Sequence, residues 1–188
     1  MELGIPYQKI EISKIHIVPQ QTGYLPFEYK DGDLTLHRIV MVTPMLKVLN
    51  FWEDRGKIEF ECDFGFLGKV SALQEVIKAV LFMQQGLFCK DRLTREEIER
   101  GFKCLSYNGK FICYVPSFIR SSGMRVVGVD GSLSYLPPRE IFVAGRVLRL
   151  GVKLGGIKVR GGRDGGGMAF FIDHQIMHIW DPMRCKIE

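Results

Sequence analysis

The 188-residue sequence has few of the features that assign a chain to a functional class at first sight. It has no run of about 20 apolar residues and no secretory signal, and its five cysteines form no Cys-x-x-Cys pair. We therefore expect a cytosolic, reducing environment with free thiols. The sequence also lacks a Gly-x-Ser-x-Gly motif and a Cys–His pair at protease spacing. We predict a protein that is not an enzyme and has no cofactor or small-molecule substrate.

The composition is that of an ordinary globular protein. Hydrophobic residues make up 46% and charged residues 25% of the chain, which excludes wholesale disorder, a collagen and a coiled coil. The length suits one domain over residues 1–188 and is short for two. We expect an extended segment over residues 1–30, because its three prolines are too closely spaced for a helix, and a core over residues 31–188.

The net charge of +5 is unevenly distributed along the chain. Residues 1–100 carry 13 Lys and Arg against 15 Asp and Glu, whereas residues 101–188 carry 13 against 6. The positive excess therefore lies in the C-terminal half. Such an excess attracts polyanions, so we expect nucleic acid, acidic lipid or an acidic protein as the partner.

The spacing of apolar residues predicts two consecutive helices in the middle of the chain. The first covers Ser71 to Gln85, with Ser71 as its N-cap. The second begins at the capping box Thr94-Arg95-Glu96-Glu97 and carries Ile98, Phe102 and Leu105 inward. We predict an α+β fold, a mostly antiparallel sheet of about seven strands with these two helices in the middle. The predicted strands include residues 9–18, 34–42, 57–64, 110–115 and 125–129.

The clearest alternation lies in a basic stretch of the C-terminal half. Apolar residues alternate with Arg149 and Lys153, then with Lys158 and Arg160, on either side of Gly155-Gly156, which we interpret as the turn of a hairpin. This hairpin contains no aromatic residue, so base stacking is not expected there. A phospholipid surface would suit it as well as RNA, and a solvated basic face is the interpretation without a function. The candidate polyanion-binding residues are Arg146, Arg149, Lys153, Lys158, Arg160 and Arg163.

Three other patterns favour structural interpretations. His174 and His178 would share one face of a helix, as in a zinc site, but no third ligand is evident and a partly buried structural pair is favoured. The glycine-rich residues 161–167 are followed by a strand-like segment, which indicates a flexible hairpin loop and not a phosphate-binding loop. The carboxylates that alternate along residues 59–63 indicate the solvated face of a strand.

The order of these elements resembles that of rhabdovirus matrix proteins. A strand at residues 57–64 leads into two helices and a further strand, and a Tyr-Leu-Pro segment at Tyr135-Leu136-Pro137 precedes the late strands, as is frequent in that family. The similarity covers roughly residues 57–160 and rests on the pattern of elements. The chain lacks the Lys-rich N-terminus and the Pro-Pro-x-Tyr motif of animal-virus members, since Arg139 follows Pro137-Pro138. A plant-infecting or divergent member fits better.

This resemblance implies a non-enzymatic viral structural protein. It would self-associate and link the viral nucleocapsid or RNA to the anionic inner leaflet of the envelope, in the virion and at membranes of the host cytoplasm, with the nucleus as a further location. The candidate self-association segment is Tyr24, Leu25, Pro26 and Phe27, and a strap across the chain's own core is the alternative. The alternative functions are an RNA-binding viral accessory protein, such as a movement protein or silencing suppressor, and a metal-dependent enzyme that uses His174 and His178.

Overall fold

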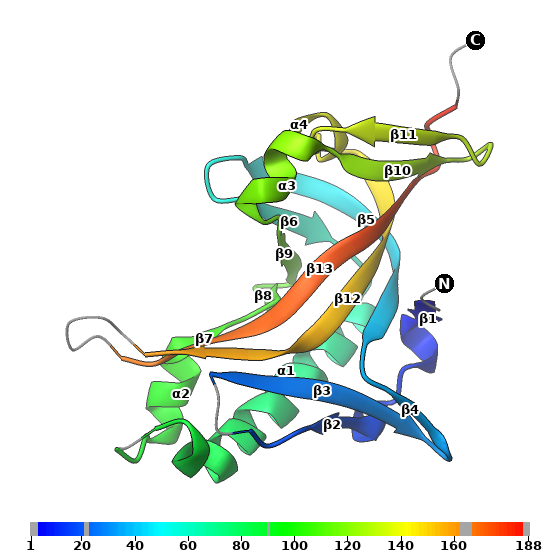
Figure 1. Cartoon of the computed structure of the whole chain (residues 1–188). Helices are drawn as coiled ribbons and strands as arrows, with labels where there is room; N and C mark the ends of the chain where they lie inside the picture. Colours follow the sequence, from blue (N-terminus) through cyan, green and yellow to red (C-terminus); the bar gives the residue numbers. More distant parts are fainter. Residues whose placement is uncertain (1–3, 21–22, 90, 162–166, 186–188) are drawn as a thin grey trace.

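The chain is organised around one connected β-sheet, seen in the computed structural model of Figure 1. The structure describes residues 4–20, 23–89, 91–161 and 167–185, which form thirteen strands. The strands are β1 (Gly4–Pro6), β2 (Ile15–Ile17), β3 (Tyr24–Asp31), β4 (Leu34–Leu36), β5 (Ile39–Trp52), β6 (Lys57–Glu61), β7 (Phe102–Lys103), β8 (Ser106–Tyr107), β9 (Lys110–Tyr114), β10 (Met124–Gly128), β11 (Leu133–Leu136), β12 (Val147–Arg160) and β13 (Ala169–Asp181).

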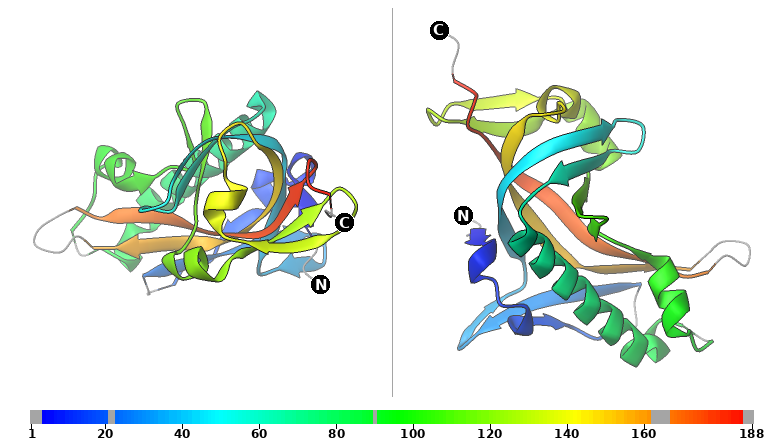
Figure 2. Two further views of the ribbon diagram at one scale, coloured as in Figure 1. Left: turned by 90° about the horizontal axis from the view of Figure 1, so that it is seen from above. Right: turned by 180° about the vertical axis from the view of Figure 1, so that it is seen from behind.

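The main path of the sheet is β11-β10-β13-β12-β5-β6-β9-β8, and the remaining strands join its sides. One long helix lies along the back of this sheet, as the right-hand view of Figure 2 shows. Its apolar side, with Leu73, Ile77 and Leu81, belongs to a core that extends from Ile10 to Ile179. The helices are α1 (Phe64–Gln84), α2 (Arg95–Gly101), α3 (Ser117–Ser122) and α4 (Pro138–Ile141), with 3-10 turns η1 (Tyr7–Lys9), η2 (Ile12–Lys14) and η3 (Gln85–Leu87).

The predicted fold class, a mostly antiparallel sheet of about seven strands with two helices in the middle, is wrong. The sheet of the described residues is larger and mixed, because β1 runs parallel to β5 and β13 runs parallel to both β7 and β10. Strands such as β7 and β8 have two residues each, too few to show any alternation in the sequence. The predicted strand over residues 9–18 is also wrong for most of its length. It contains the end of the 3-10 turn η1, the turn η2 and the three residues of β2.

Strand β5 is longer than predicted because it continues through Pro44. Proline cannot donate a hydrogen bond to a neighbouring strand, and a proline usually ends a strand unless it lies at a bulge. The pairing of β5 with β12 is irregular at this point. The hydroxyl of Thr43 accepts a hydrogen bond from the Leu150 N–H at 3.0 Å and thereby satisfies a donor that the bulge leaves unpaired. The predicted strand over residues 34–42 is therefore β4 and the first part of β5, separated by His37 and Arg38.

The predicted hairpin turn at Gly155-Gly156 is also wrong, because β12 runs straight through both glycines. On one side of β12, residues up to Leu154 pair with β5, and residues from Gly156 onward pair with β3. A Cβ atom on Gly156 would lie 2.4 Å from the Leu25 carbonyl oxygen and 2.8 Å from the Pro26 Cα. The glycine is required because the backbone of β3 approaches too closely for any side chain.

We predict that Gly156→Ala destabilises the fold by at least about 1–3 kcal/mol, because the added methyl group clashes with backbone atoms that cannot rotate away. Denaturant unfolding monitored by circular dichroism measures the change. The matched control is Gly68→Ala on α1, where a Cβ meets nothing within 4 Å. It should be neutral or stabilising by up to about 1 kcal/mol. Equal stability of Gly156→Ala and the wild type would contradict the pairing of β3 with β12.

Helices α1 and α2 begin where side chains satisfy their free N–H groups. The second predicted helix is confirmed at its start, since Thr94 and Glu97 form the capping box of α2, and its chain then passes into β7 after Gly101. The first helix begins seven residues earlier than predicted, because the Asp63 carboxylate and not Ser71 caps it. The predicted Asn108-Gly109 turn joins β8 to β9, with φ of 49° and 71° at the two residues.

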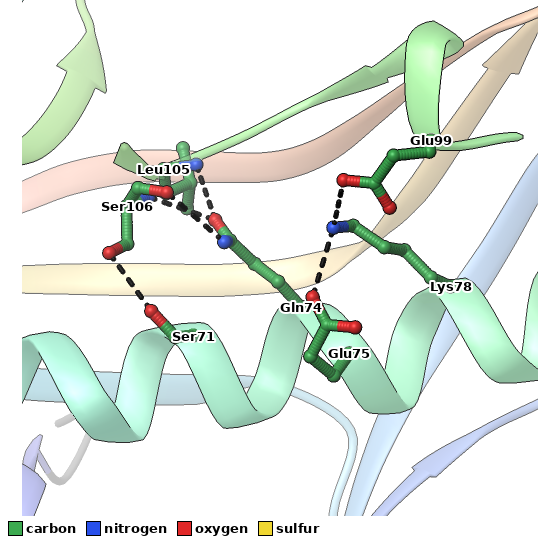
Figure 3. A network of polar contacts seen from close by, with 7 residues as sticks. All are labelled: Ser71, Gln74, Glu75, Lys78, Glu99, Leu105 and Ser106. Atoms are coloured by element: carbon green, nitrogen blue, oxygen red, sulfur yellow. Dashed lines mark hydrogen bonds and ion pairs between the residues drawn. The ribbon is translucent and has the colours of Figure 1, made fainter. Parts of the chain in front are cut away.

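Gln74, in the middle of α1, connects that helix to the segment between α2 and β9 (Figure 3). Its side-chain oxygen accepts hydrogen bonds from the N–H groups of Leu105 at 2.6 Å and Ser106 at 2.9 Å, and its amide nitrogen donates to the Ser106 carbonyl at 3.3 Å. Beside it, Lys78 forms ion pairs with Glu75 at 3.0 Å and Glu99 at 2.7 Å. Gln74 is buried, and its amide satisfies backbone groups of Leu105 and Ser106 at the end of the sheet path, where β8 pairs with β9 alone.

We predict that Gln74→Leu destabilises the protein by about 2 kcal/mol or more, because two backbone donors lose their acceptor in a buried position. Gln84→Leu on the same helix is the matched control. The side-chain oxygen of Gln84 is buried and finds no hydrogen-bond partner among the described residues. That control should therefore be neutral or stabilising. Thermal unfolding of both variants tests the prediction, and an equal loss of stability in both would contradict it.

Candidate nucleic-acid interface

Four of the predicted polyanion-binding residues lie on the outer face of strand β12. Arg149 and Lys153 alternate with buried apolar residues in the first half of the strand, and Lys158 and Arg160 do so in the second half. The bulge at Gly155 inserts one extra residue between the halves. Without this residue the alternation would turn Lys158 and Arg160 toward the core. The bulge therefore keeps all four cations on one face, over a length of about 36 Å.

The one acidic side chain opposite these cations on β13 is Asp173, and it is already engaged. Its carboxylate forms an ion pair with Lys158 at 2.6 Å and accepts a hydrogen bond from the Tyr24 hydroxyl at 3.1 Å. Burial and this carboxylate raise the pKa of Tyr24 to about 12. Arg149, Lys153 and Arg160 form no ion pair within the described part of the chain. These three residues carry the uncompensated positive charge of the face.

Aromatic side chains lie beside these cations, although the sequence predicted none there. They belong to β13, whose outward residues Phe171, His178 and Trp180 pair with Lys158, Gly151 and Arg149 of β12. Residues that lie opposite each other in paired strands share a face. The Arg160 guanidinium lies 5.4 Å from the centre of the Phe171 ring, and the rings of His178 and Trp180 are 5.7 Å apart. From the basic stretch alone, no aromatic side chain for base stacking was expected beside the cations. The structure corrects this expectation, because the neighbouring strand β13 supplies the rings.

A groove of about 410 Å³ opens at the Trp180 end of this face. Four neighbouring strands contribute to it, because Arg149 of β12 lies between Met45 of β5 and Trp180 of β13, and Trp180 pairs with Val127 of β10. The lining is mostly apolar, with Arg149 as its cationic member. The residues that line it are Val42, Met45, Val127, Gly128, Val129, Arg149, Trp180, Asp181 and Pro182.

The other two predicted polyanion-binding residues do not belong to this surface. Arg146 precedes β12, donates a hydrogen bond to the Glu140 carbonyl at 2.7 Å and lies 3.7 Å from the buried Asp181 carboxylate. Its charge therefore compensates an internal acid. Arg163 lies outside the described residues, as does most of the glycine-rich segment, which connects the antiparallel strands β12 and β13.

The predicted self-association segment forms the first part of β3 and pairs with the chain's own β12. Tyr24, Leu25 and Pro26 lie opposite Lys158, Ile157 and Gly156, and the side chains of Leu25 and Phe27 are fully buried. This is the arrangement of the strap that the sequence offered as the alternative. Exchange of the segment with another copy would require β3 to leave β12 and expose these two side chains.

His174 and His178 lie on a strand, where they do not form the pair that a helix would give. A bulge at Met177 changes the alternation of β13, so that His174 shares a face with the core residue Ile176 and His178 with Trp180. Among the described residues no group of three or more His, Cys, Asp or Glu could hold a metal ion. His174 instead bonds to the backbone.

The carboxylates of the segment after β5 are also structural. The prediction of a solvated face is wrong for Glu59, which is buried and forms ion pairs with Lys57 at 2.9 Å and Lys110 at 3.0 Å. Burial raises the pKa of Glu59, but hydrogen bonds from the two ammonium groups outweigh this effect and lower its pKa overall. Asp63 lies beyond β6 and caps α1. These residues therefore stabilise the sheet and the helix start.

His174 connects the two sides of the curved sheet. Its Nε2 accepts a hydrogen bond from the Tyr114 N–H of β9 at 2.9 Å, so its Nδ1 carries the proton and donates to the Ile172 carbonyl at 2.9 Å. On the edge of β13 away from β12, the first residues pair with β7 and the last with β10. His174 lies between these two stretches, and its side chain takes the place of a strand partner there. Burial lowers the pKa of His174 below its usual range, which keeps the imidazole neutral.

Comparison with known proteins assigns no family. No family model matches the chain, and no curated protein matches it. Among solved structures, the chain is similar to the single-stranded DNA-binding protein from bacteriophage Enc34 (a C-terminal truncation), with a TM-score of 0.39 and 11% identity, over 95% of this chain and 100% of that chain. A TM-score this low establishes neither fold nor function. Within the described residues, no helix is both long and apolar enough to span a membrane.

We predict that the stability of the protein falls as the pH is lowered below about 6.5, the usual pKa of an unfolded histidine. Burial lowers the pKa of His174 in the native chain, so the unfolded chain binds more protons at this residue and protonation favours unfolding. His174→Gln keeps an acceptor for the Tyr114 N–H and should flatten this dependence. Urea unfolding between pH 7.5 and 5.5 measures it. An unchanged slope in His174→Gln would contradict the assignment.

Proposed function

We propose that this protein is a non-enzymatic nucleic-acid-binding protein whose contact surface is the outer face of β12 and β13. The observation that carries the proposal is the row of cations on β12, three of which form no ion pair within the described residues. Cations held along one strand can contact successive phosphates of a polynucleotide. The aromatic rings of β13 on the same face add a second means of contact, which a merely solvated basic face does not need.

Binding of this kind depends on charge and carries no sequence preference by itself. The cations lie on a strand that pairs with its neighbours on both sides, so the backbone fixes the spacing at which they leave the sheet. Phosphate contacts release condensed counterions, so the affinity falls steeply with salt. We therefore propose a sequence-tolerant binder of RNA or DNA.

The matrix role predicted from the sequence stays a prediction. It adds two requirements to polyanion binding, namely attachment to an anionic membrane and self-association. The same cations would attract acidic headgroups, so both partners would compete for one face. Flotation of the protein with anionic and neutral vesicles, with and without RNA, tests this role. Salt-sensitive flotation that RNA abolishes would favour it, and absence of flotation would leave the nucleic-acid-binding accessory protein.

We predict that the triple variant Arg149→Gln, Lys153→Gln, Arg160→Gln weakens binding to a 20-nucleotide RNA by about 100-fold at 0.1 M salt. The slope of log K against log salt should become shallower by about 2, because three phosphate contacts are lost. Fluorescence anisotropy over a salt series measures both quantities.

The matched control removes the same net charge elsewhere, by glutamine substitution of the exposed residues Arg55, Arg92 and Arg139. These lie on the turn after β5, in the loop before α2 and on α4. The control should keep the wild-type slope. If both triple variants lose affinity equally, net charge alone drives binding and the proposed surface is wrong. Circular dichroism of both variants confirms that they are folded.

A further inference from the structure

The groove at Trp180 has a chemistry different from that of the rest of the outer face. Along most of β12 the face is open and cationic, whereas the groove combines apolar walls with one indole ring and the Arg149 guanidinium. Its one carboxylate, Asp181, is buried and lies 3.7 Å from Arg146. Val129 and Met45 at its sides are exposed side chains, with exposed fractions of 64% and 38%. An apolar hollow next to a cation suits a ligand with a flat apolar part and a negative charge close to it.

A nucleotide of a single strand has both parts. Its base has two apolar faces that stack on aromatic rings, and its phosphate lies a few bonds away. In a duplex the same faces are stacked on neighbouring bases and the edges are paired, so a base does not stack on a ring that lines a groove unless it is extruded. A phosphate contact requires no such exposure. The groove therefore distinguishes single strands from duplexes in a way that the cationic row does not.

The groove is also continuous with the cationic row. Arg149, which borders Trp180, is the first cation of that row, and Arg160 beside Phe171 is the last. An aromatic ring thus accompanies a cation at each end of the outer face, with Lys153 between them. A strand bound along β12 would pass the groove at one end without leaving the positive surface. This continuity favours a nucleobase over a separate small molecule as the occupant.

From these observations we infer that the groove binds one unpaired nucleobase, stacked on Trp180 with its phosphate on Arg149, and that the ligand is therefore single-stranded RNA or DNA. This inference rests on the proposed function, since it assumes that a polynucleotide lies along β12. Trp180 provides the preference for single strands, and the cations provide affinity for any polynucleotide.

The test compares four ligands of matched length: dT20, rU20, an abasic deoxyribose-phosphate 20-mer, and the dA20–dT20 duplex. Trp180→Ala should weaken binding of dT20 and rU20 by about 5- to 150-fold, and should leave binding of the abasic strand and the duplex unchanged. Trp180→Phe keeps a flat ring and should retain most of the affinity. Tyr107→Ala is the control, because it removes an aromatic side chain that is 61% exposed on β8, at the far end of the sheet path.

A second measurement leaves Trp180 intact. The chain has two tryptophans, so Trp52→Phe makes Trp180 the one indole fluorophore. Its emission should be quenched by dT20 and rU20 and not by the abasic strand. Unchanged emission with dT20 bound would overturn the inference and leave the proposed function intact. An equal loss of affinity for dT20 and the abasic strand in Trp180→Ala would do the same. Absence of salt-dependent binding to all four ligands would instead overturn the proposed function.

Discussion

The architecture depends on how strand β12 pairs its two edges with three neighbouring strands, β13, β5 and β3. One edge pairs with β13 along almost its whole length, whereas the other pairs first with β5 and then with β3. The change of partner at Gly155-Gly156 requires the backbones of β12 and β3 to approach more closely than a side chain allows. The N-terminal segment and the main sheet therefore share one core, and residues as distant as Ile10 and Ile179 pack in the same cluster.

The same change of partner creates the candidate site. The bulge that lets β12 exchange β5 for β3 also shifts its alternation by one residue, so its cations before and after the glycines face the same way. Pairing with β13 then places Phe171 and Trp180 among those cations. Neither strand alone has both kinds of side chain. The surface is thus a property of the pair, which explains why the basic segment taken by itself indicated phosphate binding and excluded stacking.

Sequence patterns predicted the local features that depend on neighbouring residues. They failed for features whose conformation depends on segments far away in the chain. The Thr94–Glu97 capping box and the Asn108-Gly109 turn are local, and both were found. The glycine pair at 155–156 has the composition of a turn, but Gly156 pairs with Pro26 of β3 on one side and Asp173 of β13 on the other, which makes it part of a strand. Trp180 could have been noticed from the alternation of residues 169–181, but the bulge at Met177 breaks that pattern. A buried charge such as Glu59 cannot be recognised from the sequence either, because its partner Lys110 lies on another strand.

Strand β13 pairs with β12 along nearly its whole length on one edge, but only at its two ends on the other. Backbone partners hold its first residues through β7 and its last through β10, while the stretch between them has β12 on one side alone. The hydrogen bond from the Tyr114 N–H to the imidazole of His174 links this middle stretch of β13 to β9 on the inner face of the sheet. Desolvation lowers the pKa of this partly buried imidazole, and the neutral form that this favours accepts the bond without the cost of a charge inside the protein. A histidine that the sequence offered as a metal ligand thus supports the strand from its inner side and leaves the outer side of β13 to the contacts with the β12 cations.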